Sequence, residues 1–155
     1  MALSATGLKS ALAGWTEQIW LECLTFDHPT MTAPIRVVND KVDLVRTAGT
    51  FIAFPFSFQD FVRADDQAVT AAITADNVDQ RIITALRGVV GRPTVMYEAV
   101  LHDTPNVVER GPMDFEVLGF QANAASISLQ ISFAFSFLGE AFPKGYFAPW
   151  NAATV

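Results

Sequence analysis

One stretch near the C-terminal end constrains the fold more than any other part of this sequence. Between Ile127 and Phe137, apolar residues alternate with small or polar residues without an exception. Side chains of a β-strand point alternately to opposite faces, so this period of two predicts a long strand with one face in a core. We expect Phe133 and Phe135 to be buried there. The apolar set is Ile127, Leu129, Ile131, Phe133, Phe135 and Phe137, and the other set is Ser128, Gln130, Ser132, Ala134 and Ser136.

Shorter runs of strand-forming residues fill most of the remaining chain. Asn39-Asp40 tolerates left-handed backbone geometry, so residues 35–38 and 41–45 are expected to pair as a hairpin around it. Pro55 lacks the N–H group that a sheet ladder needs, which predicts an edge strand or a bulge at that position. The other strands expected are 15–26, 50–58, 68–75, 94–102 and 113–120, with a loop at 59–67 and a turn at 110–112.

Two segments show helical spacing instead. In residues 4–14, Ser4 can cap the start of a helix and Gly14 can end it. In residues 76–88, Asn77 can act as the N-cap. The apolar residues in phase are Leu8, Ala11 and Leu12 in the first segment and Val78, Ile82, Ile83 and Leu86 in the second.

The order of these elements predicts the fold class. Strands follow one another without regular intervening helices, which is typical of antiparallel rather than parallel sheets. We therefore expect a mainly β fold, an antiparallel β-sandwich or barrel, with an N-terminal helix and one internal helix. A length of 155 residues fits one domain over residues 1–155.

Composition narrows the class of function. Half of the residues (51%) are hydrophobic and only 17% are charged, so we expect either a Phe-rich core or apolar surface that meets a partner. The net charge of −6 disfavours a protein built to bind the phosphate backbone of nucleic acid, which needs a basic face. No apolar run approaches the roughly 20 residues of a membrane span. Neither nucleic acid nor membrane is an expected partner.

Residues that could carry chemistry are few. His28 and His102 each stand beside an aspartate, and a metal site would have to join the two pairs. The alternative, that both are solvated turn residues, is favoured because each pair lies where a predicted strand ends. Cys23 faces inward by strand parity and reads as an inert core residue. The sequence has no hydrolase, P-loop or paired-cysteine motif, so we expect no enzyme activity, metal or cofactor.

The last segment, residues 139–155, predicts a docking arm. Pro143 and Pro149 prevent it from continuing a strand, yet it is too aromatic for a free tail. Its docking residues are expected to be Phe142, Tyr146, Phe147 and Trp150. Folding of the arm over its own core remains an alternative.

Four stretches, taken in order, resemble a family of small tailed-phage proteins described as minor tail or tail-tip proteins. They are Ile35–Asp40 with Gly49–Phe56, Asp76–Arg87, Val100–Glu109, and Phe142–Trp150. The resemblance implies a distal tail protein in the virion of a long-tailed phage, assembled in the host cytoplasm. It further implies a homo-oligomeric ring, expected to be a hexamer, that joins the tail tube to the tail tip. The implied neighbours are the tail tube protein, the tape measure protein and the tail hub protein.

A binding module is the second hypothesis. A β-sandwich at the tail tip could bind carbohydrate or a receptor, which would require exposed aromatic residues beside polar clusters. By sequence only the C-terminal arm offers such residues, so the structural role is preferred. A metal hydrolase using His28 and His102 is the least favoured hypothesis.

Overall fold

The computed structural model describes residues 3–62, 70–76, 84, 87–123 and 126–133, and it confirms a mainly β chain with an N-terminal helix. Ser4 caps the helix by accepting a hydrogen bond from the N–H of Gly7, as the sequence predicts. The helix is α1 (Ala5–Leu12), and the strands are β1 (Trp20–Asp27), β2 (Ile35–Val38), β3 (Leu44–Arg46), β4 (Gly49–Ala53), β5 (Phe56–Val62), β6 (Thr70–Asp76), β7 (Thr94–Leu101), β8 (Thr104–Ala122) and β9 (Ser126–Phe133).

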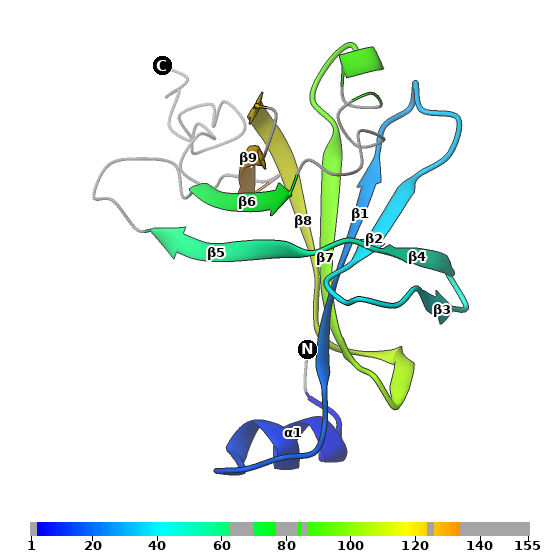
Figure 1. The fold of residues 1–155 in the computed structure, drawn as a ribbon, viewed down its shortest axis with the longest axis vertical. Helices are drawn as coiled ribbons and strands as arrows, with labels where there is room; N and C mark the ends of the chain where they lie inside the picture. The colour runs from blue at the N-terminus through cyan, green and yellow to red at the C-terminus, as the bar shows by residue number, and fades with distance from the viewer. Residues whose placement is uncertain (1–2, 63–69, 77–83, 85–86, 124–125, 134–155) are drawn as a thin grey trace, which may run out of the picture.

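The strands form one sheet that folds over itself. Their order is β3-β4-β2-β1-β7-β8-β9-β6-β5. Among the described strand pairs, β2 and β4 run parallel, and the others run antiparallel. In Figure 1, β5 crosses in front of the long strands β7 and β8, β6 lies in front of β9, and α1 lies apart at the lower end. This arrangement places apolar residues of distant strands face to face and leaves α1 outside the sheet.

Strand β1 is central because both of its faces are buried. Leu24 and Phe26 belong to the larger core between the crossing layers. Leu21 and Cys23, one residue out of phase, belong to a smaller core that β3 and β4 cover. A strand buried on both faces carries apolar residues at both alternating sets of positions, as Leu21 and Cys23 on one face and Leu24 and Phe26 on the other do here.

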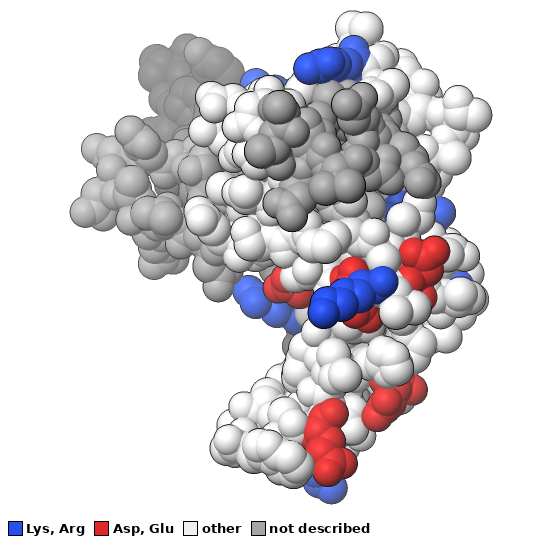
Figure 2. All heavy atoms as spheres, in the orientation of Figure 1, with Lys and Arg blue, Asp and Glu red and all other residues white. Residues whose placement is uncertain are grey.

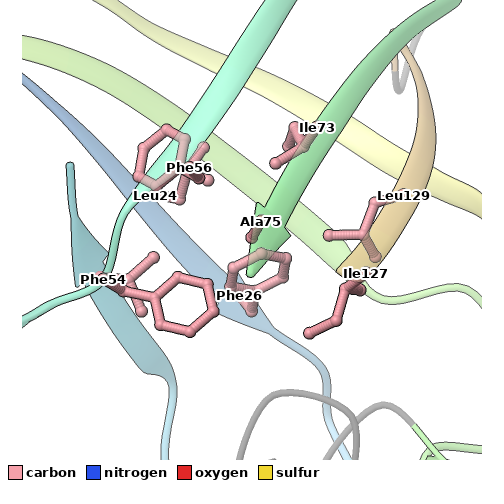
Figure 3. Close-up of a pocket in the computed structure, with 9 residues that line it drawn as sticks. Leu24, Phe26, Phe54, Phe56, Ile73, Ala75, Ile127 and Leu129 are labelled. Atoms are coloured by element: carbon pink, nitrogen blue, oxygen red, sulfur yellow. The ribbon is translucent and has the colours of Figure 1, made fainter. Parts of the chain in front are cut away.

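The larger core is filled by side chains. Phe56, Ile73 and Leu129 come from the neighbouring strands β5, β6 and β9 of one layer, and in Figure 3 they lie around the same space as Leu24 and Phe26 from β1 in the other layer. The cavity between these layers has a volume of about 10 Å³. That is about the smallest space that can hold one water molecule. The interior is therefore a packed core and not a ligand cavity.

The strongest sequence pattern is confirmed along most of its length. Ile127, Leu129 and Ile131 are all buried in the larger core. Phe133 departs from the prediction, because its side chain is 41% exposed at the end of β9. Its ring still lies 5.1 Å from the ring of Phe115, so it covers the rim of the core. Phe135 lies outside the described residues.

The predicted hairpin around Asn39-Asp40 is wrong. β2 pairs with β1 and β4, and β4 stands between β2 and β3 in the sheet. The backbone N–H of Asn39 donates to the carbonyl of Glu22, and its side-chain oxygen accepts from the N–H of Phe56. Asn39 is thus tied to distant strands instead of turning the chain locally. The local hairpin is β3–β4, where Gly49 adopts a φ of 130°.

Three further boundaries differ from the predictions. β1 begins at Trp20, five residues later than expected. Residues 59–62 of the predicted loop belong to β5, and residues 63–67 lie outside the described residues. Pro55 separates β4 from β5, consistent with the break expected there. The predicted turn at 110–112 is a distortion inside β8, where Gly111 has a φ of 95°.

Two predicted segments fall largely outside the described residues. Within 76–88, Asp76 ends β6, and Thr84, Arg87 and Gly88 are helical, while the other positions are not described. The arm at 139–155 is not described at all. None of the helical residues in the described part belongs to a helix long and apolar enough to cross a membrane.

Candidate functional site

The two histidines lie at opposite ends of the same strand pair. Trp20 pairs with Leu101 and Asp27 pairs with Thr94, so His28 follows one end and His102 the other. Seven residues at about 3.3 Å each separate these ends by roughly 23 Å. The hypothesis of a shared metal site is therefore wrong. Within the described ranges, no three His, Cys, Asp or Glu side chains lie close enough together to hold a metal ion.

Cys23 is buried beside an ion pair in the smaller core. Arg46 on β3 and Glu98 on β7 approach to 2.6 Å, and the guanidinium lies 5.0 Å from the centre of the Phe51 ring. Burial raises the pKa of the Cys23 thiol to about 11, and the nearby charge of Arg46 acts in the opposite direction. A protonated, enclosed thiol is a poor nucleophile. The prediction that Cys23 is a core residue is confirmed by its burial.

The first 17 described residues, 3–19, form a projection that we call the foot. In this projection α1 is oriented opposite to a usual amphipathic helix. Its buried residues are Gly7 and Ser10. The exposed fractions of its large apolar side chains and those of the following connector are 48% for Leu8, 78% for Leu12, 78% for Trp15 and 59% for Ile19. The small and polar side of the helix faces the protein, and the apolar side faces outward.

A buried carboxylate holds the start of α1 in this orientation. Glu109 of β8 is 2% exposed and accepts hydrogen bonds from the backbone N–H of Ser4 at 2.8 Å and from its hydroxyl at 2.5 Å. Negative charge at a helix N-terminus is favourable because the N–H groups there are unpaired. A Cβ atom at Gly7 would collide with an oxygen of this carboxylate, so a larger residue there would displace Glu109 from its position.

Irregular pairing between β7 and β8 aims Glu109 at the helix. Ala99 pairs with Arg110 and Val100 with Val108, which leaves Glu109 as an extra residue between two registers. Such bulges redirect side chains out of the regular alternation. A second irregularity contains Gly111, where a Cβ atom would lie 2.6 Å from the carbonyl oxygen of Tyr97. Both bulges lie at the base of β8, next to the foot.

The end of the foot is tied to the sheet by a second polar contact. The indole N–H of Trp20 donates to the hydroxyl of Ser10 at 3.0 Å. Ser10 also shares a hydrogen bond of 3.1 Å with the hydroxyl of Thr16. These bonds hold the connector against the inner side of α1. The orientation of the outward apolar residues is thus set by polar contacts at both ends of the helix.

An open cleft lies beside the foot. Its volume is about 530 Å³, and its lining is apolar apart from Glu109 and Arg110. The lining residues are Leu3, Trp20, Glu109, Arg110, Gly111, Pro112 and Met113. Glu109 and Gly111, which lie at the two irregularities of β8, are both part of its lining. The foot and this cleft together form the candidate site, an interaction surface.

A smaller hollow opens between β8 and β9 on the outer face of the sheet. Its volume is about 160 Å³, and Gln121, Ser128 and Gln130 surround it together with Gly119 and Phe120. Within the described part, the side chains of Gln121, Ser128 and Gln130 have no hydrogen-bond partner. The register shifts beside Gly119, which opens the surface at this point.

The sequence pointed to a different interaction surface. The predicted interface residues Phe142, Tyr146, Phe147 and Trp150 lie outside the described residues, so that prediction stays a prediction. The foot was missed, although Leu8 and Leu12 were placed on one helix face. The overlooked signal is the pair Gly7 and Ser10 on the other face. Residues this small or polar allow that face to lie close against the protein through hydrogen bonds, which leaves the apolar face outward.

Comparison with protein-family models gives one match. A model for a domain of unknown function, DUF1833, matches residues 7–146. The chain belongs to this family. The DUF1833 match begins inside α1 and runs past β9, so it includes most of the foot, all of the cleft lining except Leu3, and every described strand. No curated protein matches the chain.

Proposed function

We infer that this chain is a structural, non-enzymatic subunit in the virion of a long-tailed phage. The role that fits it best is a distal or minor tail protein whose ring, a hexamer of identical subunits, joins the tail tube to the tail tip. Tail tube protein, tape measure protein and tail hub protein are its neighbours in this proposal. The phage assignment is supported by the resemblance of the four sequence stretches described above.

The observation that carries the assembly role is the outward apolar side of the foot. Leu8, Leu12 and Trp15 would each gain by leaving water, at roughly 25 cal/mol per Å² of apolar surface. The hydrogen bonds of the buried Glu109 to Ser4 hold the helix in this outward-facing orientation. Exposed apolar surface rimmed by polar groups is typical of protein–protein contacts. The foot therefore favours a chain that functions in an assembly.

Localisation in the virion provides the direct test. Antibodies against the purified protein, applied to particles of a phage that encodes it, should label one end of the tail in electron micrographs. Particles produced without the chain should have unattached or tipless tails, and a supplied copy should restore them. Absence of the chain from purified infectious virions, measured by mass spectrometry, would reject the proposal.

A carbohydrate-binding role is the second candidate, and the hollow between β8 and β9 favours it. Amide and hydroxyl groups, here Gln121, Ser128 and Gln130, are the groups that bind neutral sugars. Titration of the protein with oligosaccharides from host cell walls, followed by NMR, tests this role. Shifts confined to β8 and β9 and lost in Gln130→Ala would support it, and no shifts at millimolar sugar would reject it.

A further inference from the structure

We propose that the foot of one copy of this chain seats in the cleft of the next copy. This inference rests on the proposed assembly role and assigns the contact that would build it. The chain carries both halves of the contact, one projecting and one hollow, at neighbouring positions. Figure 1 shows α1 extending from the lower end of the sheet, where a second molecule can reach it.

The projecting half is rigid and apolar. Leu8 and Leu12 are one helical turn apart and therefore lie side by side on the helix surface. Trp15 follows three residues later, in the connector after α1. The hydrogen bonds of Glu109 to Ser4 and of Trp20 to Ser10 fix this surface before any partner arrives. Pre-ordering of this kind lowers the entropic cost of association.

The hollow half matches in size and chemistry. A cavity of roughly 150 Å³ is enough for a benzene-sized apolar group. The cleft of about 530 Å³ can therefore receive about three large side chains, such as Leu8, Leu12 and Trp15 of the foot. Leu3, Trp20 and Met113 supply apolar lining for them. Large side chains seated in a well-packed pocket are the usual anchors of an interface.

Charge favours a second copy over other occupants. The foot carries Lys9 and Glu17, both exposed, so it has no net charge to attract a nucleic acid or an anionic membrane. Arg110 at the cleft and Asp114 just beyond it are exposed as well. Each charge on the foot thus has an opposite charge near the cleft. Figure 2 shows the lower end of the molecule as largely uncharged, with acidic side chains beside it.

The outward residues Leu8, Leu12 and Trp15 are not among those that line the cleft, so the contact is head-to-tail. A head-to-tail contact continues from copy to copy and closes into a ring when the rotation allows it. Pairing of two feet with each other would instead stop at a dimer. The proposal therefore makes a specific statement about the products of cross-linking.

Engineered cysteines test this statement. In Leu12→Cys/Met113→Cys, mild oxidation should produce a ladder of dimers, trimers and larger species on non-reducing gels. The native Cys23 is buried and should not contribute. The matched control is Val90→Cys/Met113→Cys, because Val90 is highly exposed but outside the foot. Leu12→Cys alone should give no more product than this control.

Three results would overturn the inference. A ladder that is no stronger than the control, while the unmodified protein forms oligomers by light scattering, would place the contact elsewhere and leave the ring role standing. Dimers from Leu12→Cys alone would show foot-to-foot pairing. A protein that stays monomeric at every concentration would also reject the contact, whereas antibody labelling of virions would still decide the tail role independently.

A charged foot gives a second measurement. Leu12→Glu should weaken self-association at least tenfold by analytical ultracentrifugation, because the carboxylate would enter an apolar cleft. Its circular dichroism spectrum and melting temperature should match those of the unmodified protein, since Leu12 is exposed. Association within twofold of the original value would contradict the proposal.

Discussion

The sheet and the foot use opposite arrangements of the same side-chain types. In the sheet, large apolar residues such as Phe115 and Ile131 face inward and are fully buried. In the foot, polar groups face inward and Leu12 and Trp15 face outward. The sheet therefore obtains its stability from its own core, whereas the foot is positioned by hydrogen bonds and presents its apolar surface to a partner.

The largest effect should come from opening the core. Phe115→Ala removes a fully buried ring that contacts Phe58 and Phe133, at centroid distances of 6.3 and 5.1 Å. Truncation of a core Phe costs about 3–5 kcal/mol, a large share of the ~5–15 kcal/mol of a whole domain. Urea denaturation followed by tryptophan fluorescence measures it. The matched control is Phe133→Ala, which should lose clearly less because that ring is partly exposed.

Equal losses in the two Phe variants would break the comparison at its first step. They would mean that the rim of β9 is as fully packed as its centre. The burial of Phe133 that the sequence pattern predicts would then be correct, despite the 41% exposure of its side chain in the structure.

The second effect should be confined to the foot. Glu109→Ala leaves the N–H and hydroxyl of Ser4 without their acceptor, at a cost of about 1–3 kcal/mol for unsatisfied partly buried groups. Hydrogen exchange should accelerate at amides of α1 and remain unchanged in β1 and β7. Glu116→Ala is the control, since that carboxylate is more exposed and lies 3.6 Å from Arg92. Faster exchange across the whole sheet would show that the foot is part of the core.

The contrast also explains what sequence reasoning could reach. The side of β9 that faces the core could be predicted because strand alternation is a local property, and Ile127, Leu129 and Ile131 follow it. The cap by Ser4 was readable for the same reason. The orientation of α1 could not be predicted in this way, because it depends on Glu109, which is 105 residues away from Ser4 in the sequence.

The error at Asn39-Asp40 has a similar cause. The dipeptide fits a tight turn locally, but its position is decided by bonds to Glu22 and Phe56 and by the parallel pairing of β2 with β4. Likewise, Arg110-Gly111-Pro112 has the composition of a turn and forms a bulge inside β8. The residue types thus indicated where the chain departs from regular strand geometry. Pairing between distant strands determined whether each position forms a turn or a bulge.

A third effect should appear only in alkaline solution. The pKa of Cys23 is raised from 9.0 to about 11, so above pH 9 the unfolded chain loses the thiol proton while the folded chain keeps it. Stability contributed by this group is therefore present below pH 9 and is lost as the pH rises through 11. Cys23→Ala should show a shallower loss of stability than the unmodified protein between pH 9 and 11.

Thiol labelling gives a second measure of the same enclosure. At pH 8 the folded protein should react with a thiol reagent only as fast as it opens, and the reaction should become immediate in denaturant. Rapid labelling of the folded protein would mean that the smaller core is open to solvent. The sheet would then not be stabilised by a closed core on both faces of β1.

The smallest effect on stability should come from the most apolar part of the surface. Leu12→Gln and Trp15→Gln replace side chains that remain largely exposed to water in the folded protein. The free energy of unfolding should therefore change by no more than about 0.5 kcal/mol. Gln keeps most of the length and helix propensity of Leu, and it adds no charge. Matched substitution of the buried Leu24 by Gln should be severe, because an amide would enter the larger core without a partner. A loss above 2 kcal/mol in Leu12→Gln would show that the foot packs on its own chain. Its apolar side would then belong to the core, and the head-to-tail contact would have no free surface from which to form.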